Sequence, residues 1–205
     1  MRVAAIVLAA GASSRMGSPK PLLELQGDTF LGRILDTLGQ VDGVGDRIAV
    51  LGHLSARVRR GVRFAGARPV TCRGWRGGML ASLRCGARAA LAADPGLGAV
   101  LVCHVDQPLL RAGTHARLLR AFRAGRGEVL VAAHGGRPGH PVLLARGFLD
   151  RLLRDRGVGS LAEAIARHAR SRGLVACRDA AVTQNINDRA ALTALAVQLE
   201  IHKAC

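Results

Sequence analysis

Residues 3–20 read VAAIVLAAGASSRMGSPK, and the expected architecture of the chain follows from this stretch. Its first part, Val3–Ala9, is an apolar run with the length of a buried β-strand. The run enters a loop of small residues, whose backbone N–H groups can approach an anion closely. Arg15 and Lys20 add positive charge to the loop. N–H donors and cations together suit a triphosphate, because they neutralise the charge that develops as pyrophosphate leaves.

The spacing of this loop excludes two commoner phosphate-binding motifs. A Walker A loop needs G-x-x-x-x-G-K-[ST], but Gly11 and Gly17 lie one residue too far apart for it, and Lys20 does not follow Gly17 directly. The dinucleotide fingerprint G-x-G-x-x-G is also absent. The remaining alternative to a nucleotide site is an ordinary strand-to-helix turn that carries Arg and Lys by chance.

Outward from this stretch, short apolar runs alternate with helical patterns. We expect strands at Val3–Ala9, Arg47–Leu51, Pro69–Cys72, Ala99–Val105, Glu128–His134, His140–Ala145 and Leu174–Arg178. We expect helices at Thr29–Val41, in a short segment through Val58, and at Met79–Ala92, Thr114–Ala124, Phe148–Leu153, Leu161–Ala169 and Asp188–Leu199. This alternation predicts an α/β domain with a mostly parallel sheet, whose ligands bind at the carboxyl ends of the strands.

Length and composition predict one domain over residues 1–205. No apolar run approaches the roughly 20 residues that span a bilayer, and the N-terminal run leads directly into a Gly/Ser turn. A secretory signal is therefore not expected, and the cytoplasm is the expected location. The 5 cysteines form no Cys-x-x-Cys pair, so we expect scattered reduced thiols and neither a zinc site nor a disulfide framework.

The net charge of +16 has two interpretations. One is nucleic-acid binding through phosphate neutralisation, and the other is an enzyme with small polyanionic substrates. The sequence contains no basic run of the kind found in nucleic-acid-binding arms, and aromatic residues, which form stacking platforms for single strands, make up only 2% of it. We therefore expect neither a nucleic-acid nor a membrane partner.

The string from Leu8 to Lys20, L-A-A-G-x-S-x-R-M-G-x-x-K, resembles the signature of nucleotidyltransferases with a nucleotide-diphospho-sugar transferase fold. Within them, the chain is most similar to the branch that contains molybdenum cofactor cytidylyltransferase, from Val3 to about Leu195. The resemblance implies a three-layer Rossmann-like fold with a mostly parallel mixed sheet. It also implies a nucleotide-binding half at residues 1–110 and an acceptor-binding half at residues 111–205.

A second segment, WRGGMLASLRCG from Trp75 to Gly86, resembles the family's W-x-x-G-M-x-x-S-L-x-x-G. Cys72 stands where the family has Asn. We expect Leu83 to pack in the core. With the first loop, the resemblance implies these nucleotide-binding residues: Leu8, Ala9, Ala10, Gly11, Ser13, Arg15, Lys20, Gly78, Met79 and Ser82.

Asp106 ends a buried apolar run and precedes Gln107 and Pro108, which suits a magnesium ligand, because Mg²⁺ takes one or two carboxylates together with substrate phosphates. Asp106-Gln107-Pro108 also resembles the family's D-x-P, in which the Asp binds Mg²⁺. Asn187, in the place of the family's second metal-site residue, is the other candidate ligand. The alternative role of Asp106 is to cap the following helix, and we expect Asp188 to be a helix cap. We expect strand alternation to turn His104 away from Asp106, in a structural role.

The segment Gly136–Val142, GRPGHPV, resembles the family's acceptor-facing G-x-x-G-H-P-V. His140 is the acceptor-binding candidate, and it either contacts the acceptor or caps the strand. The implied reaction transfers CMP from CTP to a phosphorylated acceptor, with molybdopterin as the best candidate, and Arg15, Lys20 and Asp106 as catalytic residues. CTP is favoured because Leu8-Ala9-Ala10-Gly11 resembles the cytidylyl branch.

Three rivals to this reaction stay open. The nearest is a guanylyltransferase of the same superfamily, and the next is another small-acceptor, sugar-phosphate nucleotidyltransferase. The third is a non-catalytic protein that delivers a cofactor, which would fit transient contact with a cofactor-accepting apoenzyme.

Overall fold

The computed structural model describes residues 2–13, 16–188, 190–193 and 195, and it contains a sheet of seven strands. The order across the sheet is β5-β4-β1-β6-β8-β7-β9. Every neighbouring pair is parallel except the two pairs that involve β8. The strands are β1 (Val3–Ala9), β4 (Val44–Leu51), β5 (Arg68–Thr71), β6 (Ala99–His104), β7 (Val129–His134), β8 (Arg137–Ala145) and β9 (Arg172–Ala176).

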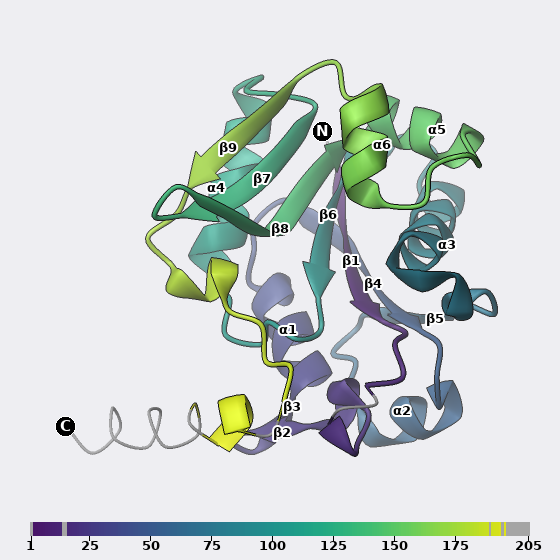
Figure 1. Cartoon of the computed structure of the whole chain (residues 1–205), viewed down its shortest axis with the longest axis vertical. Coiled ribbons are helices and arrows are strands. Elements are labelled where there is room, and N and C mark those ends of the chain that lie inside the picture. Colours follow the sequence, from purple (N-terminus) through teal and green to yellow (C-terminus); the bar gives the residue numbers. More distant parts are fainter. Residues whose placement is uncertain (1, 14–15, 189, 194, 196–205) are drawn as a thin grey trace.

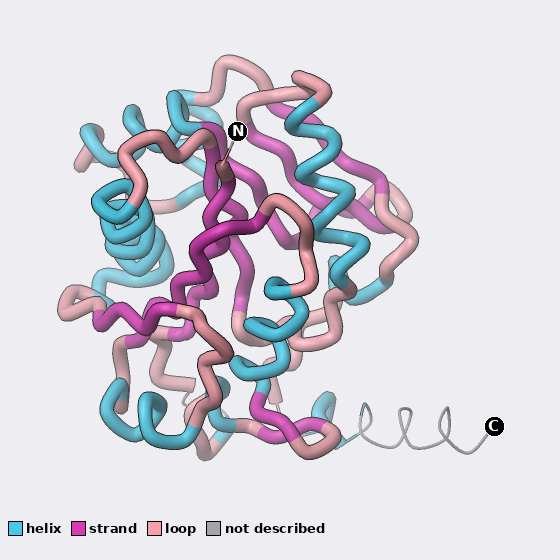
Figure 2. Tube along the Cα trace, turned by 180° about the vertical axis from the view of Figure 1, so that it is seen from behind, coloured by secondary structure: helices cyan, strands magenta, loops and turns pink. Residues whose placement is uncertain are grey.

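Helices cover both faces of this sheet and make three layers (Figure 1). One face packs against α1 (Phe30–Gly39) and α4 (Ala112–Arg123), and the other against α3 (Gly78–Ala93), α5 (Arg146–Arg154) and α6 (Leu161–His168). Figure 2, seen from behind, shows helices in cyan over the magenta strands on that side too. The remaining elements are α2 (Ser55–Gly61), the 3₁₀ helices η2 (Lys20–Leu22), η3 (Trp75–Gly77) and η4 (Ala180–Thr183), and a two-stranded hairpin of β2 (Glu24–Leu25) and β3 (Asp28–Thr29). Within the described residues, no helix is both long and apolar enough to cross a membrane.

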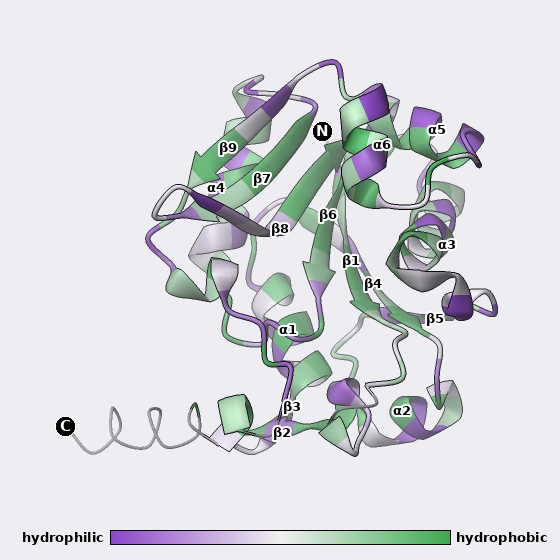
Figure 3. Ribbon diagram, viewed as in Figure 1, coloured by the Kyte–Doolittle hydropathy of each residue, from purple (hydrophilic) through white to green (hydrophobic). Residues whose placement is uncertain are grey.

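The alternation of side chains along β1 explains why it lies near the middle of the sheet. Val3, Ala5 and Val7 pack into the core on the α1 side, whereas Ile6 and Leu8 pack into the core on the α3 side. Every residue of β1 is buried, and burying one large apolar side chain contributes roughly 1.5–3 kcal/mol. A strand that is apolar on both faces is stable only between two layers of helices, and Figure 3 shows the central strands in the green of hydrophobic residues.

The predicted elements are present, although β4 begins at Val44 and not at Arg47, and β9 spans Arg172–Ala176 and not Leu174–Arg178. There are three further differences. β8 begins at Arg137, because the turn between β7 and β8 consists only of Gly135 and Gly136, both at positive φ. The β2–β3 hairpin was not predicted, because two-residue strands carry no periodic pattern. The helix predicted at residues 188–199 lies largely outside the described residues. The predicted fold class, a three-layer fold with a mostly parallel mixed sheet, is confirmed.

Candidate functional site

A cavity of about 510 Å³ opens at the carboxyl ends of β1 and β6, where the topology of a parallel sheet places ligands. Loops after β1, β5 and β6 and the segment after η4 contribute its walls. Its lining residues are Leu8, Ala10, Gly11, Ser13, Met16, Lys20, Trp75, Arg76, Gly78, Met79, Ser82, His104, Val105, Asp106 and Asn187. Most of the predicted nucleotide-binding and metal-binding residues therefore line one cavity.

The loop after β1 curls around the side chain of Ser13. The Ser13 hydroxyl accepts a hydrogen bond from the backbone N–H of Lys20 at 3.0 Å. The backbone carbonyl of Ser13 accepts one from Met16 N–H at 2.9 Å. Ser13 itself has a φ of 53°. At Gly11, a Cβ would meet no heavy atom within 4 Å. The protein's own packing therefore does not require glycine there, and the space beside that backbone is part of the cavity.

Lys20, Asp106 and Asn187 meet on the floor of the cavity. The Lys20 ammonium donates to Asn187 Oδ1 at 2.7 Å and lies 3.4 Å from Asp106 Oδ2. The side chains of Lys20 and Asp106 are only 13% and 19% exposed, which makes this pair one of the more buried in the structure. The backbone N–H of Ile186 donates to the Asp106 carbonyl at 2.9 Å and so fixes the Asn187 segment to the Asp106 loop.

The donor atoms of this cluster fit a hard divalent cation. Asp106 Oδ1 is buried and has no hydrogen-bond partner among the described residues. A buried carboxylate oxygen without a partner is costly, so it is expected to meet a cation or a donor in the working protein. Asn187 Oδ1 supplies a second oxygen. This oxygen and the other carboxylate oxygen, Asp106 Oδ2, already face one cation, Lys20. Among the described residues, no three His, Cys, Asp or Glu side chains gather into a metal site, which agrees with a metal that takes its other ligands from substrate phosphates and water.

The loop after β5 and the start of α3 make the opposite wall. Gly78 has a φ of +86°, which favours glycine, and it lets the chain turn from η3 into α3. Trp75 lines the cavity with its ring 5.5 Å from that of His53, and the Arg76 guanidinium lies 4.8 Å over the same indole. Gly52 permits this packing, because a Cβ there would lie 2.6 Å from the indole.

Two side chains on α3 behave differently from each other. Met79 is 62% exposed, so it does not serve core packing, whereas Leu83 is 1% exposed and lies in the core as predicted. Ser82 lines the cavity, but its hydroxyl lies 3.3 Å from the Gly78 carbonyl and donates to it. A nucleotide that used this hydroxyl as a donor would have to displace the contact within the helix.

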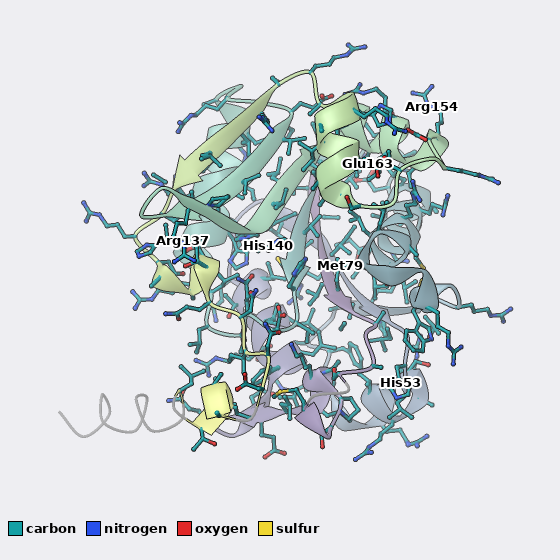
Figure 4. The ribbon with its side chains drawn as sticks, in the orientation of Figure 1. His53, Met79, Arg137, His140, Arg154 and Glu163 are labelled. Atoms are coloured by element: carbon teal, nitrogen blue, oxygen red, sulfur yellow. The ribbon has the colours of Figure 1, made fainter. Side chains whose placement is uncertain are left out.

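A second cavity of about 520 Å³ adjoins the first and shares Leu8, Gly78, Met79 and His104 with it. His140, on β8, lies in this second cavity, and Figure 4 labels it in the same region as Met79, which also lines the cavity. The lining includes apolar residues of the sheet and of α3 and α6, and it includes no Arg, Lys, Asp or Glu side chain among the described residues. The cavity is therefore suited to an uncharged part of a ligand.

The structure corrects the prediction for His104. Its side chain lines both cavities and stacks on His140, with ring centroids 3.7 Å apart. Alternation did not separate His104 from Asp106, because β6 ends at His104 and Asp106 already lies in the following turn. Burial lowers the pKa of both histidines, that of His140 to about 3 with a smaller contribution from His104, so His140 is uncharged at neutral pH.

Two of the predicted nucleotide-binding residues are not among the described residues that line the first cavity. Ala9 does not line the cavity, because its side chain is 2% exposed and packs in the core on the α1 side. Arg15 lies outside the described residues. Conversely, Trp75, Arg76 and His104 line the first cavity without having been named as site residues, although Trp75 and Arg76 begin the segment that resembles the family's second motif. The one tryptophan of a chain this poor in aromatics was a signal in the sequence that could have identified Trp75.

Gln107 links the loop of Asp106 to η4, a contact that the sequence did not reveal. It is only 2% exposed, and its Nε2 donates to the carbonyls of Val182 at 3.0 Å and Ala181 at 3.3 Å. Both acceptors belong to η4, which directly precedes the segment with Asn187. Gln107 therefore positions Asn187 relative to Asp106 without lining the cavity.

Comparison with known sequences places this geometry in a family. The family described as MobA-like NTP transferase domain matches residues 5–172. The nicotine blue oxidoreductase of Paenarthrobacter nicotinovorans is 33% identical over 154 residues, which cover 71% of this chain and 72% of that protein. The molybdenum cofactor guanylyltransferase of Sinorhizobium fredii is 32% identical over 174 residues, which cover 82% of this chain and 76% of that protein.

Among solved structures, Rv0371c from Mycobacterium tuberculosis superposes with a TM-score of 0.79 at 27% identity, over 96% of this chain and 98% of that one. A structure of Rv0371c in complex with manganese superposes with a TM-score of 0.73 at 24% identity, over 96% of this chain and 99% of that one. The similarity extends over nearly the whole length of both chains.

Proposed function

Because the chain belongs to the family of MobA-like NTP transferase domains, and so is a nucleotidyltransferase, we propose that it transfers CMP from CTP to a phosphorylated acceptor and releases pyrophosphate. The best acceptor candidate is molybdopterin, since a relative at 32% identity is named a molybdenum cofactor guanylyltransferase. The observation that carries the proposal is the cluster of Lys20, Asp106 and Asn187 in the first cavity, with one carboxylate oxygen left unpaired.

In the proposed reaction, an oxygen of the acceptor phosphate attacks the α-phosphorus of the triphosphate. The new P–O bond forms as the bond between the α-phosphorus and its bridging oxygen to the β-phosphate breaks, and pyrophosphate takes the electron pair. The protein needs to position the groups and stabilise charge, and it forms no covalent bond. Lys20 faces the cavity and would neutralise the leaving phosphates. We assign Arg15 the same task, although it lies outside the described residues.

Asp106 and Asn187 would hold the metal, which we propose is Mg²⁺. When bound, such a cation supplies charge neutralisation and orientation of the triphosphate. With the cation present, Asp106 Oδ1 would gain the partner that it lacks. The Lys20 ammonium, which now contacts Asp106 Oδ2 and Asn187 Oδ1, would then be free to turn to a phosphate.

We place the acceptor in the second cavity, beside His140. Its uncharged body would lie among the apolar side chains there, with its phosphate at the junction that both cavities share. On this proposal residues 1–110 supply most of the nucleotide site and residues 111–205 most of the acceptor site. His140 is neutral, because burial lowers its pKa to about 3, so it would contact the acceptor as a hydrogen-bonding group and not as a cation.

Guanylyl transfer is the second candidate, and the name of the Sinorhizobium fredii relative favours it. The two nucleotides differ in the size of the base. Ala10 lines the first cavity, and its methyl would restrict a purine more than a pyrimidine. Size exclusion by one methyl is worth roughly 1–3 kcal/mol. If the enzyme prefers CTP over GTP by about tenfold, Ala10→Gly should reduce this preference. An unchanged ratio of the rates with CTP and GTP would show that the Ala10 methyl does not set the preference.

Pyrophosphate release with each of the four nucleoside triphosphates, with and without molybdopterin, tests the proposal. We expect release only with an acceptor and a divalent cation, and fastest with CTP. Asp106→Asn should lower the rate at least about a hundredfold, or about 2.7 kcal/mol of transition-state stabilisation, at an unchanged melting temperature. A preference for GTP would select the second candidate, and a fully active Asp106→Asn enzyme would remove the metal assignment.

A further inference from the structure

A third cavity, of about 530 Å³, is lined by arginine side chains. Its lining residues are Cys72, Arg73, Gly74, Ala81, Arg84, Cys85, Arg88 and Arg156, none of which lines the nucleotide cavity. The same loop and the same helix nevertheless contribute residues to both cavities. Arg73 and Gly74 face the arginine cavity, while Trp75 and Arg76 of the same loop face the nucleotide cavity, and Ala81 and Ser82 of α3 divide in the same way. The two cavities therefore lie on either side of one loop and one helix.

Some surface arginines elsewhere in the structure pair with carboxylates, whereas the arginines of this cavity do not. Arg63, Arg68, Arg146, Arg151 and Arg167 each pair with a carboxylate. Within the described part of the chain, the side chains of Arg73, Arg88 and Arg156 make no hydrogen bond or ion pair.

Arg84 is the inner member of the group. Its Nη2 donates to the backbone carbonyl of Asp155, while its Nε is buried and has no hydrogen-bond partner among the described residues. The carboxylate of Asp155 does not compensate these charges, because it accepts hydrogen bonds from Gly157, Arg167 and His168. Four guanidinium groups thus surround one cavity without a counter-charge in its lining.

The floor of the cavity is uncharged and does not repel an anion. It consists of Ala81 and two thiols, Cys72 and Cys85. Burial raises the pKa of Cys85 to about 11, with a further contribution from Cys72, so the thiol remains protonated at neutral pH. Thiolates, which would oppose anion binding, are therefore not expected at Cys85.

We propose that this arginine cavity (Arg73, Arg84, Arg88 and Arg156) is a second anion site that binds a small oligophosphate. One guanidinium group can bind two phosphate oxygens at once through two parallel N–H donors. Four of them around one space match a ligand with several negative charges better than they match a single phosphate. The cavity is as large as the nucleotide cavity, about 530 against 510 Å³, and lies within the roughly 300–1,000 Å³ of small-molecule sites.

The test counts binding sites for tripolyphosphate by calorimetry, without divalent metal and at about 0.15 M ionic strength, where diffuse surface charge is screened. We expect two equivalents to bind the wild-type chain. Lys20→Met should remove the equivalent in the nucleotide cavity and leave the other. The triple variant Arg73→Gln, Arg88→Gln, Arg156→Gln should weaken the second equivalent at least tenfold and leave the Lys20-dependent one. Arg84 is kept, because it holds the Asp155 carbonyl.

A matched control separates a built site from the overall positive charge. Arg57, Arg60 and Arg120 are exposed, and their side chains have no hydrogen bond or ion pair within the described part of the chain. Their triple replacement by Gln removes the same charge and should leave two equivalents. Absence of an equivalent that persists in the Lys20→Met variant, or equal weakening in both triple variants, would overturn the proposal. If only the nucleotide cavity failed to bind tripolyphosphate, the Lys20-dependent equivalent would be missing and the other would remain.

The source of the oligophosphate is decided by competition with nucleoside triphosphates. If a nucleotide displaces tripolyphosphate from the Lys20→Met variant with at least tenfold higher affinity, the ligand is a nucleotide whose base also makes contacts. If the nucleotide and tripolyphosphate bind with equal affinity, the site recognises only the phosphate chain. Nucleotides that do not compete at all would contradict the proposal, because their triphosphate presents the same groups. The one tryptophan, Trp75, lies in the loop between the two cavities, so its fluorescence should respond to the second equivalent.

Discussion

At the scale of single residues, a substitution at Gly11 should affect nucleotide binding without affecting the stability of the fold. A Cβ at Gly11 meets no protein atom within 4 Å, so Gly11→Ala should leave the melting temperature unchanged. The methyl would instead occupy space beside the backbone that a triphosphate approaches, and we expect the KM for the nucleotide to rise about tenfold, or about 1.4 kcal/mol. Gly113→Ala is the matched control, since Gly113 is equally open but lies in α4. An unchanged KM in Gly11→Ala would show that no ligand approaches there.

His140 gives a prediction about acid stability. Burial lowers its pKa from 6.5 to about 3, with a smaller effect of His104. Between these values the unfolded chain binds a proton that the folded chain does not, so the stability is fully present above pH 6.5 and falls as the pH drops towards 3. The slope for one group is up to about 1.4 kcal/mol per pH unit. Denaturant unfolding between about pH 7 and pH 5 should show a shallower slope for His140→Phe, and parallel slopes would contradict the assignment.

The sequence predicted individual site residues unevenly, and the reason is physical. Lys20, Asp106 and Asn187 were predicted because they stand at fixed places in motifs, and the structure brings them together. His104 was misjudged because alternation holds only inside a strand and β6 ends there. Gln107 was missed because its role depends on a contact with a segment more than seventy positions away, which no local pattern shows.

At the scale of elements, the contact between the β6–α4 loop and η4 should control the metal site. Gln107→Leu removes the Nε2 donor from the carbonyls of Val182 and Ala181, of which the Ala181 carbonyl keeps the Gln184 N–H. A buried carbonyl left without a partner costs roughly 1–3 kcal/mol. We expect a lower melting temperature and a severalfold higher Mg²⁺ concentration for half-maximal activity. Gln184→Leu is the control, because Gln184 is exposed beside the same segment. If both variants have the same Mg²⁺ requirement as the wild-type enzyme, Gln107 does not position Asn187.

Elements with strong periodicity were predicted well, and β1 agrees residue by residue at Val3–Ala9. The direction of β8 could not be predicted from its own residues. An apolar run reads the same in parallel and antiparallel strands, and only the two-glycine turn before it indicates a hairpin. The β2–β3 hairpin is too short for any pattern, although its Thr29 caps α1 by accepting a hydrogen bond from Gly32 N–H.

At the scale of the whole molecule, the net charge of +16 comes from basic residues scattered along the sequence without a long basic run, which indicates a surface with diffuse positive charge. Such a surface attracts duplex DNA only through diffuse electrostatics, which salt weakens steeply. We therefore expect weak DNA binding at about 0.05 M salt and almost none at about 0.2 M, as measured by fluorescence anisotropy. Tight, sequence-selective binding at the higher salt would contradict an enzyme of small anionic substrates.

The fate of the α-phosphate tests the central claim most directly. The enzyme is incubated with molybdopterin, Mg²⁺ and CTP labelled at the α-phosphate, and in parallel with CTP labelled at the γ-phosphate. We predict that the α-label moves to the acceptor in the same amount as the γ-label appears in pyrophosphate, and that Asp106→Asn abolishes both. Release of the α-label as free CMP, or no transfer from any nucleoside triphosphate, would contradict nucleotidyl transfer by this site.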